Sequence, residues 1–469
     1  MEILIVTPEI TPYSGRTELG ALAAALPKGL RGLEHHVVVL SPLYSCVDPA
    51  AHSLARRLST LDVTLDGETQ SCALYDGRTT GGIDLLFIGH PAFGEHAAED
   101  DDEATRRAAV VLCQAAAALS RQLEPRPEVV HALGFQAALS LPLCRPPGRS
   151  EAGGEDGPAT VLSPANLTAH GQFGPEELAA LQPGQAVLAA LDASPTGNLL
   201  AAGMRAADRV VMDSAAAVKA LKSSEVAQPL LSALSGADEQ VTYVLSGLDA
   251  SYWNTLTDSH LTARFDAADT SGKDQCKGAL EYELGLPARP DSPLVAIVGG
   301  PLSEEECAVI QDALRNDLQL VVAAEHGLPP ALAEVGEQYD DQIKAMPPED
   351  TGAQHRLLSG ADFVLIPKAG SARSQIHLAA LRYGALPIAS TGGPAEESLV
   401  DCDSRLTTGN GFLFRDRDSL LSALQRAVAA FAQNDAFNAL RRRAMRTDVS
   451  WERAARRYEH IYRSGRVSG

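Results

Sequence analysis

Short runs rich in β-branched residues alternate with longer Ala- and Leu-rich runs along almost the whole chain. We predict buried strands at residues 3–7, 36–40, 84–88, 129–132, 160–162, 209–212, 241–245, 295–298, 319–323, 342–345, 363–366 and 386–389. Helical periodicity predicts helices between many of them, for example at residues 19–33, 104–122, 175–191 and 304–315. Strands that alternate with helices form right-handed βαβ units and parallel sheets. Twelve strands are more than one ordinary open sheet contains. We therefore predict an α/β chain with two doubly wound domains.

Composition narrows the class of protein further. The chain has 469 residues, is 45% hydrophobic and carries a net charge of −21. This hydrophobic share excludes a disordered chain, and no apolar run reaches the length that spans a bilayer. Because an acidic surface repels phosphate backbones and anionic lipids, we expect neither nucleic acid nor a membrane as a partner. The apolar stretch at the start is too short for a signal peptide, and the seven Cys form no C-x-x-C pair. These features predict a cytoplasmic protein without a metal site or cofactor.

An ordered set of short motifs along the chain resembles bacterial glycogen synthases and plant starch synthases. The matching segments are residues 9–13, 25–30, 247–249, 252–254, 258, 272–273, 277, 284–286, 360–362, 380–384, 391–393, 409–412 and 444–451. Their order and spacing match the family over nearly the whole chain.

This resemblance implies the GT-B architecture, in which two Rossmann-like domains face a deep cleft. It places an acceptor-side domain at residues 1–245, a nucleotide-sugar-side domain at 246–448, and a helix at 449–469 that crosses back to the first domain. The implied reaction is metal-free, retaining transfer of glucose from ADP-glucose to an α-1,4-glucan. Such a site must neutralise the diphosphate leaving group and hold the glucose hydroxyls.

The residues that would neutralise the diphosphate are replaced. The family's Lys-x-Gly-Gly turn aligns with Gly15, Arg16, Thr17 and Glu18, so the lysine position is a glycine. Side chains at the paired-glycine positions crowd a turn that needs bare backbone. We therefore expect a weakened phosphate site, in which Arg16 is either a substitute cation or an ordinary loop arginine.

The phosphate-facing cations of the second domain are also missing. The family's arginine and lysine after the first strand of this domain align with Gly300 and Glu305. The sequence from Ser303 to Glu306 instead predicts a helix N-cap with an acidic first turn, which stabilises a helix and repels a diphosphate.

Sugar-binding positions differ as well. Ser371 takes the place of the family's glutamate, Gly134 lies in the altered His-Asp-Trp-His element, and Ala165 replaces a histidine near the transferred sugar. A serine can exchange hydrogen bonds with a sugar but carries no charge. His131 and His170 lie nearby in the sequence, and we interpret both as structural histidines.

Candidate nucleotide-sugar contacts remain at Thr391, Gly392 and Gly393, with Arg16, Lys368, Ser371 and Arg373 as further candidates. The glycine pair fits either a phosphate-binding turn or a tight strand-to-helix turn. Likewise, Lys368 and Arg373 are either anion ligands or surface charges.

These replacements lead to two hypotheses. In the first, the chain is a non-catalytic or strongly impaired synthase-like protein, a pseudoenzyme of α-glucan metabolism without catalytic residues. It would bind an α-glucan such as glycogen, or dock on an active glycogen synthase. In the alternative, it is an active retaining glycosyltransferase that uses ADP-glucose and a relocated phosphate site built from Arg16, Lys368 and Arg373.

Overall fold

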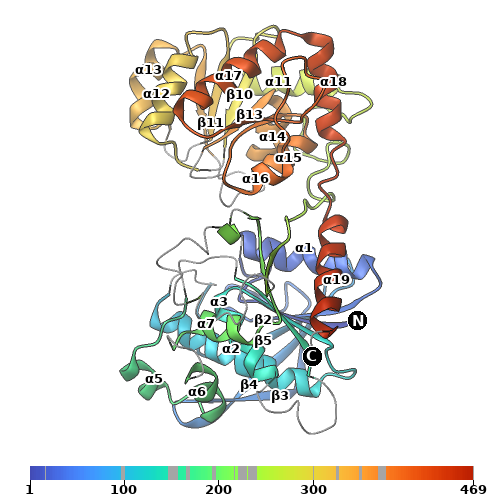
Figure 1. The fold of residues 1–469 in the computed structure, drawn as a ribbon, viewed down its shortest axis with the longest axis vertical. Coiled ribbons are helices and arrows are strands. Elements are labelled where there is room, and N and C mark those ends of the chain that lie inside the picture. Colours follow the sequence, from blue (N-terminus) through green and yellow to red (C-terminus); the bar gives the residue numbers. More distant parts are fainter. Residues whose placement is uncertain are drawn as a thin grey trace. The chain divides into compact units, whose positions relative to one another are not determined.

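The computed structural model describes residues 1–15, 17–96, 101–145, 157–164, 170–192, 197–215, 217–219, 230, 240–298, 300–323, 327–347, 351–367 and 376–467. The chain divides into two compact units (Figure 1). The first contains Met1–Ser246 together with Trp451–Gly469, and the second contains Gly247–Ser450. The end of the chain therefore belongs to the unit in which the chain begins.

The first unit is built on a nine-stranded sheet with the order β3-β4-β5-β2-β1-β6-β7-β8-β9. Its strands are β1 (Glu2–Val6), β2 (His36–Pro42), β3 (Ala55–Leu65), β4 (Glu68–Arg78), β5 (Asp84–Gly89), β6 (Val129–Leu133), β7 (Ala159–Ser163), β8 (Arg209–Met212) and β9 (Val241–Tyr243). Its helices are α1 (Glu18–Gly32), α2 (Glu103–Gln122), α3 (Phe135–Ala138), α4 (Ser140–Cys144), α5 (Pro175–Leu181), α6 (Gln185–Asp192), α7 (Leu199–Ala206) and α19 (Trp451–Val467). The strand β1 pairs in parallel with β2 and β6, so both of its edges are covered.

The second unit is built on a six-stranded parallel sheet with the order β12-β11-β10-β13-β14-β15. Its strands are β10 (Leu294–Ile297), β11 (Gln319–Ala323), β12 (Ile343–Met346), β13 (Phe363–Ile366), β14 (Leu386–Ser390) and β15 (Phe412–Phe414). Its helices are α11 (Ser271–Glu283), α12 (Glu304–Ala313), α13 (Pro330–Gln338), α14 (Thr351–Gly360), α15 (Ile376–Arg382), α16 (Pro394–Ser398), α17 (Arg417–Phe431) and α18 (Asn434–Met445). Buried Leu, Ile, Val and Ala side chains form a separate core in each unit.

The predicted architecture is confirmed, because every predicted strand is present and two mostly parallel sheets carry helices between their strands. The sequence reading missed β15 in the second sheet and, in the first sheet, β3 and β4, which form an antiparallel hairpin at its edge. Asp66 and Gly67 form its turn with φ angles of 57° and 76°. An Asp-Gly pair with two positive φ angles is typical of a two-residue hairpin turn, so the signal was present in the sequence.

The predicted single helix at residues 175–191 is wrong. The chain forms α5 and α6 instead, separated at Gln182 and Gly184, whose φ angles are 39° and 84°. Pro183 lies between them and has no backbone N–H to continue a helix. Both segments are rich in Ala and Leu, which favour helix on either side of the break.

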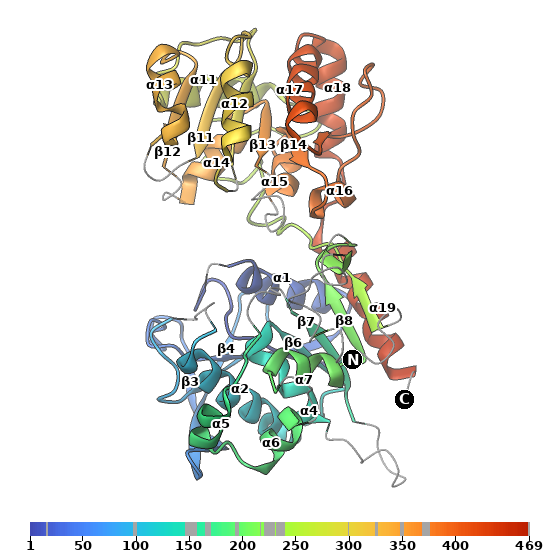
Figure 2. The same ribbon diagram turned by 60° about the vertical axis from the view of Figure 1, so that its left-hand side comes forward.

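The terminal helix α19 lies beside α1 in the first unit (Figure 2). Trp451, Ala455, Tyr458 and Tyr462 are predicted to share one stripe, and their exposed fractions are 7%, 0%, 4% and 0%. The stripe is therefore buried in the core of the first unit, and this apolar packing holds α19 there.

Candidate functional site

The loop between β1 and α1 closes around the carboxylate of Glu9. Glu9 is 4% exposed, and its Oε1 accepts hydrogen bonds from the Thr17 hydroxyl and, at 3.1 Å, from the backbone N–H of Gly20. The other carboxylate oxygen, Oε2, lies so close to Gly15 that a Cβ on Gly15 would overlap it. The Glu9 carboxylate would therefore have to move to admit a side chain at position 15.

Thr17 and Glu18 stabilise the start of α1. Thr17 is the N-cap residue, and its hydroxyl accepts a hydrogen bond of 3.4 Å from the N–H of Gly20. Glu18 lies in the first turn, where a negative charge interacts favourably with the helix dipole. The Gly20 N–H at this helix end is thus directed at groups of the protein itself.

The turn after β14 contains Thr391, Gly392 and Gly393, the three candidate nucleotide-sugar contacts that the structure describes in the second unit. Gly392 has a φ angle of 92°, a backbone conformation that favours glycine over other residues. No atom of the described residues beyond its chain neighbours lies within 4 Å of the position that a Cβ would take there. Its backbone N–H donates a hydrogen bond of 2.7 Å to Oε2 of Glu396 in α16. A carboxylate of the protein therefore takes the donor that the resemblance assigns to a phosphate.

The predicted helix start at Ser303 is confirmed. The Ser303 hydroxyl accepts from the N–H of Glu306 at 3.2 Å, and the Glu306 carboxylate accepts from the N–H of Ser303 at 2.9 Å. This reciprocal capping box begins α12, while Gly300 precedes it with a φ angle of 156°. Glu305 is exposed in the first turn, so position 305 presents a negative charge to solvent.

Near the end of β6, the hydrogen bonds of Gly134 and His131 stabilise the fold. The N–H of Gly134 donates to the carbonyl oxygen of Ser163 at 2.8 Å, and its φ angle is 76°. His131 is fully buried, with Nδ1 2.8 Å from the Tyr462 hydroxyl and Nε2 2.9 Å from the Ser163 hydroxyl. Burial lowers the pKa of His131 to about 3, so the ring is neutral and joins β6, β7 and α19. The backbone N–H of the half-buried His170 lies 3.2 Å from Asp101 Oδ2.

The remaining candidate positions, Arg16, Ala165, Lys368, Ser371 and Arg373, lie outside the described residues.

Several cationic side chains of the second unit are buried in its core and pair with other groups of the protein. Lys277 Nζ lies 2.8 Å from one carboxylate oxygen of Asp362, and Arg441 Nη2 lies 2.6 Å from the other. Burial raises the pKa of Asp362, but the charges of Lys277 and Arg441 outweigh it and hold the pKa below its ordinary value. These three side chains are at most 8% exposed and form a structural ion network.

Lys273 is likewise structural. Its ammonium group donates to the backbone carbonyls of Leu358, Ser359 and Tyr383 at 2.8–3.0 Å. Burial lowers the pKa of Lys273 to about 7.

A buried aromatic cluster in the second unit escaped the sequence reading. Nδ1 of His355 lies 2.6 Å from Asp258, and the Tyr383 hydroxyl donates to the same carboxylate oxygen. The indole of Trp253 stacks on His355 with ring centroids 4.4 Å apart. Asp258, Trp253 and Tyr383 were noted as family motif residues, but no local pattern indicates that they meet around His355.

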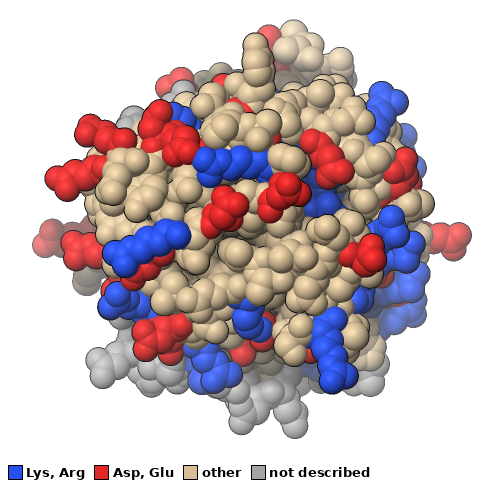
Figure 3. All heavy atoms as spheres, turned by 90° about the horizontal axis from the view of Figure 1, so that it is seen from above, with Lys and Arg blue, Asp and Glu red and all other residues tan. Residues whose placement is uncertain are grey.

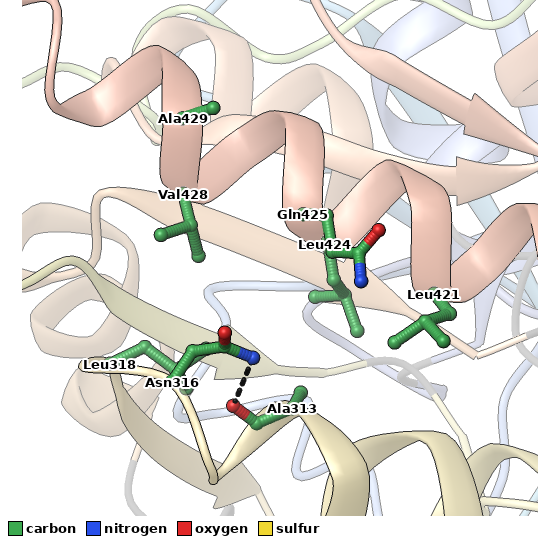
Figure 4. A pocket seen from close by; sticks show the side chains of 8 residues that line it. All are labelled: Ala313, Asn316, Leu318, Leu421, Leu424, Gln425, Val428 and Ala429. Carbon is green, nitrogen blue, oxygen red and sulfur yellow. Dashed lines mark hydrogen bonds between the residues drawn. The ribbon is translucent and has the colours of Figure 1, made fainter.

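A pocket in the second unit lies between α12 and α17 (Figure 4). It has a volume of about 170 Å³ and is lined by Ala313, Asn316, Leu318, Leu421, Leu424, Gln425, Val428 and Ala429. These residues are apolar or neutral amides, so the pocket does not suit a diphosphate. On the face drawn in Figure 3, acidic and basic side chains are interspersed. No helix in the part of the chain that the structure describes has the length and apolar character needed to cross a membrane.

Comparisons with known proteins agree with the fold. Residues 2–235 match the family model described as the starch synthase catalytic domain. A glycogen synthase of Anaeromyxobacter sp. (strain Fw109-5) is 34% identical over 99% of this chain and 99% of its own. The chain belongs to the glycogen synthase and starch synthase family.

Other members of the family and a solved structure extend the match. The chloroplastic soluble starch synthase 1 of Solanum tuberosum is 27% identical over 98% of this chain and 78% of its own. The catalytic domain of starch synthase IV from Arabidopsis thaliana, solved with ADP and acarbose, is 23% identical, with a TM-score of 0.83 over 99% of both chains. The protein therefore has the GT-B fold of this family.

Proposed function

We propose that this member of the family has lost, or very largely lost, the transfer of glucose from ADP-glucose, and that it serves α-glucan metabolism as a binding or partner module. One observation carries the proposal: the buried carboxylate of Glu9 occupies the space beside Gly15, where the resemblance places a lysine that meets the phosphates. Position 15 therefore supplies no cation beside this carboxylate.

The second unit supports the proposal independently. The Gly392 N–H is bonded to Glu396, and an exposed carboxylate lies at Glu305, where the resemblance places a lysine.

The size of the expected effect follows from transition-state electrostatics. Loss of one donor that stabilises the transition state costs about 2.7–4 kcal/mol, and each 1.36 kcal/mol is tenfold in rate. Loss of two or three such groups predicts a rate at least ~10⁴-fold below that of an ordinary synthase, even with incomplete additivity.

An assay of the transfer of radioactive glucose tests the proposal directly. The full chain, purified from a host without its own synthase, is incubated with ADP-[¹⁴C]glucose and glycogen beside an active family member. We expect incorporation at least ~10⁴-fold below the active enzyme. Incorporation at a comparable rate would overturn the proposal and favour an active enzyme with a relocated phosphate site.

Binding measurements then separate the two roles of an inactive protein. Co-sedimentation with glycogen is the result expected of a glucan-binding module, with the first unit as the side we expect the glucan to contact. A chain that stays in the supernatant, but is retained by an immobilised active synthase, is a partner module. A chain that does neither contradicts this part of the proposal.

A further inference from the structure

The outward face of α19 carries a row of basic side chains. Arg453, Arg456, Arg457 and His460 are all exposed and follow one another at helical spacing, opposite the buried stripe that contains Tyr458. Residues three and four apart on a helix are neighbours on its surface, so these side chains form one continuous strip. We call these four residues the α19 basic stripe.

This stripe contrasts with the rest of the chain. The last 29 residues, 441–469, include nine Arg and three acidic residues, in a chain whose net charge is −21. Some arginines elsewhere have acidic partners, as in the pairs of the half-buried Arg107 with Asp66 and Arg356 with Glu283. Arg456 and Arg457 have no ion pair with any residue that the structure describes. Because like charges at this spacing repel, the stripe destabilises the isolated helix slightly.

A complementary surface is present in the second unit. Glu304 and Glu305 in α12 and Glu334 and Glu337 in α13 are exposed, and the two helices contact each other. Within the described ranges these four carboxylates also have no ion pair. We call them the α12–α13 acidic set.

We propose that the α19 basic stripe of one copy docks on the α12–α13 acidic set of a second copy of this chain. Guanidinium groups pair with carboxylates in a two-bond geometry that a lysine cannot make, and the segment 441–469 contains arginine but no lysine. Because the two surfaces differ, the contact is heterologous: one copy keeps its acidic set free and the other keeps its stripe free for further association. This inference goes beyond the loss of glucosyl transfer and does not depend on it.

Sedimentation velocity of the full chain at low and high salt is the first test. Exposed charge pairs are screened over about 8–10 Å at physiological ionic strength and over about 3 Å at 1 M. We expect species larger than the monomer at low salt, in proportions that rise with protein concentration, and monomer at 1 M salt. A monomer at low salt and high protein concentration would overturn the proposal.

Charge reversal locates the contact. The variant R456E/R457E is expected to remain monomeric at low salt with an unchanged unfolding temperature, because both side chains are exposed. The matched control R442E/R446E changes the net charge equally on exposed positions of, and just after, α18, and should still associate. Equal loss of association in both variants would show an effect of net charge alone and refute the docking site.

A charge swap completes the test. R456E/R457E and E304R/E305R are each expected to be deficient in association alone. They are expected to associate when mixed, because the unaltered stripe of E304R/E305R meets the unaltered acidic set of R456E/R457E, and the two reversed surfaces also carry opposite charges. Failure of the mixture to associate contradicts the assigned pairing. Binding of inorganic polyphosphate by the stripe without any self-association would also overturn the proposal, in favour of a polyanion ligand.

Discussion

Gly29 of α1 lies directly against Ala455 of α19. A Cβ added at Gly29 would be 2.8 Å from the Ala455 Cβ and 3.2 Å from the carbonyl oxygen of Trp451. These distances are shorter than ordinary van der Waals contact, so the close approach of the two helices requires a glycine at this position.

The substitution Gly29→Ala is therefore expected to destabilise the protein. Overpacking of a tight contact costs about 1–3 kcal/mol, which outweighs the better helix propensity of alanine. Gly32→Ala in the same helix is the control, because nothing lies within 4 Å of its added Cβ. Urea unfolding of the two variants measures the difference, and equal midpoints would contradict the close packing of α19 on α1.

The contact of Glu9 with Gly15 predicts strong coupling between these two positions. Gly15→Ala alone should destabilise the protein, because the new Cβ overlaps the Glu9 carboxylate. In a Glu9→Ala background the same change should cost much less. We expect a coupling energy of about 1–3 kcal/mol in a double-mutant cycle of unfolding free energies. Additive effects would show that Glu9 does not occupy this space.

Burial of His131 predicts a specific loss of stability in acid. Its pKa falls from an ordinary 6.5 to about 3 in the folded chain, so below pH 6.5 the unfolded chain binds a proton that the folded chain does not. The free energy of unfolding should therefore decrease as the pH falls from about 6.5 to about 3, by up to about 1.4 kcal/mol per pH unit from this residue.

His131→Gln should flatten that dependence, measured as urea unfolding between pH 4 and 7. The exposed His460→Gln is the control and should keep the slope of the original chain. An unchanged slope in His131→Gln would mean that His131 is protonated in the folded state.

The buried ion network around Asp362 predicts a large effect of one neutral substitution. Asp362→Asn leaves Lys277 and Arg441 buried without their counter-charge, and breaking a buried pair in this way costs about 3–5 kcal/mol. Asp340→Asn removes an exposed pair with Lys344 and should cost less than about 1 kcal/mol. Thermal unfolding compares them, and similar shifts would contradict a structural role for Asp362.

Much of the fold follows from local pattern. Most buried strands of the two sheets are visible as short β-branched runs, because strands covered on both faces are apolar throughout. The strand β15, with the sequence Phe-Leu-Phe, has no β-branched residue and was missed. The hairpin β3–β4 and the break between α5 and α6 were missed, although Asp66-Gly67 and Pro183-Gly184 mark both. In each case a turn signal of two residues was outweighed by the pattern around it.

The candidate site was only partly predictable. That Gly15, Gly300 and Glu305 lack the family's cations is evident from residue type and order. That Glu396 binds the Gly392 N–H, and that His355 meets Asp258, is not, because these contacts depend on backbone positions set elsewhere in the fold.

By itself the sequence determined the α/β pattern, the family and the absence of particular charges at particular positions, since these depend on residue type and spacing. Only the tertiary structure decided what the remaining charges do. It placed Glu9 against Gly15 and turned Lys273 and Lys277 into core residues. The physical reason is that a charge is compensated by whatever lies within a few ångströms, and those neighbours come from distant parts of the chain brought together by packing.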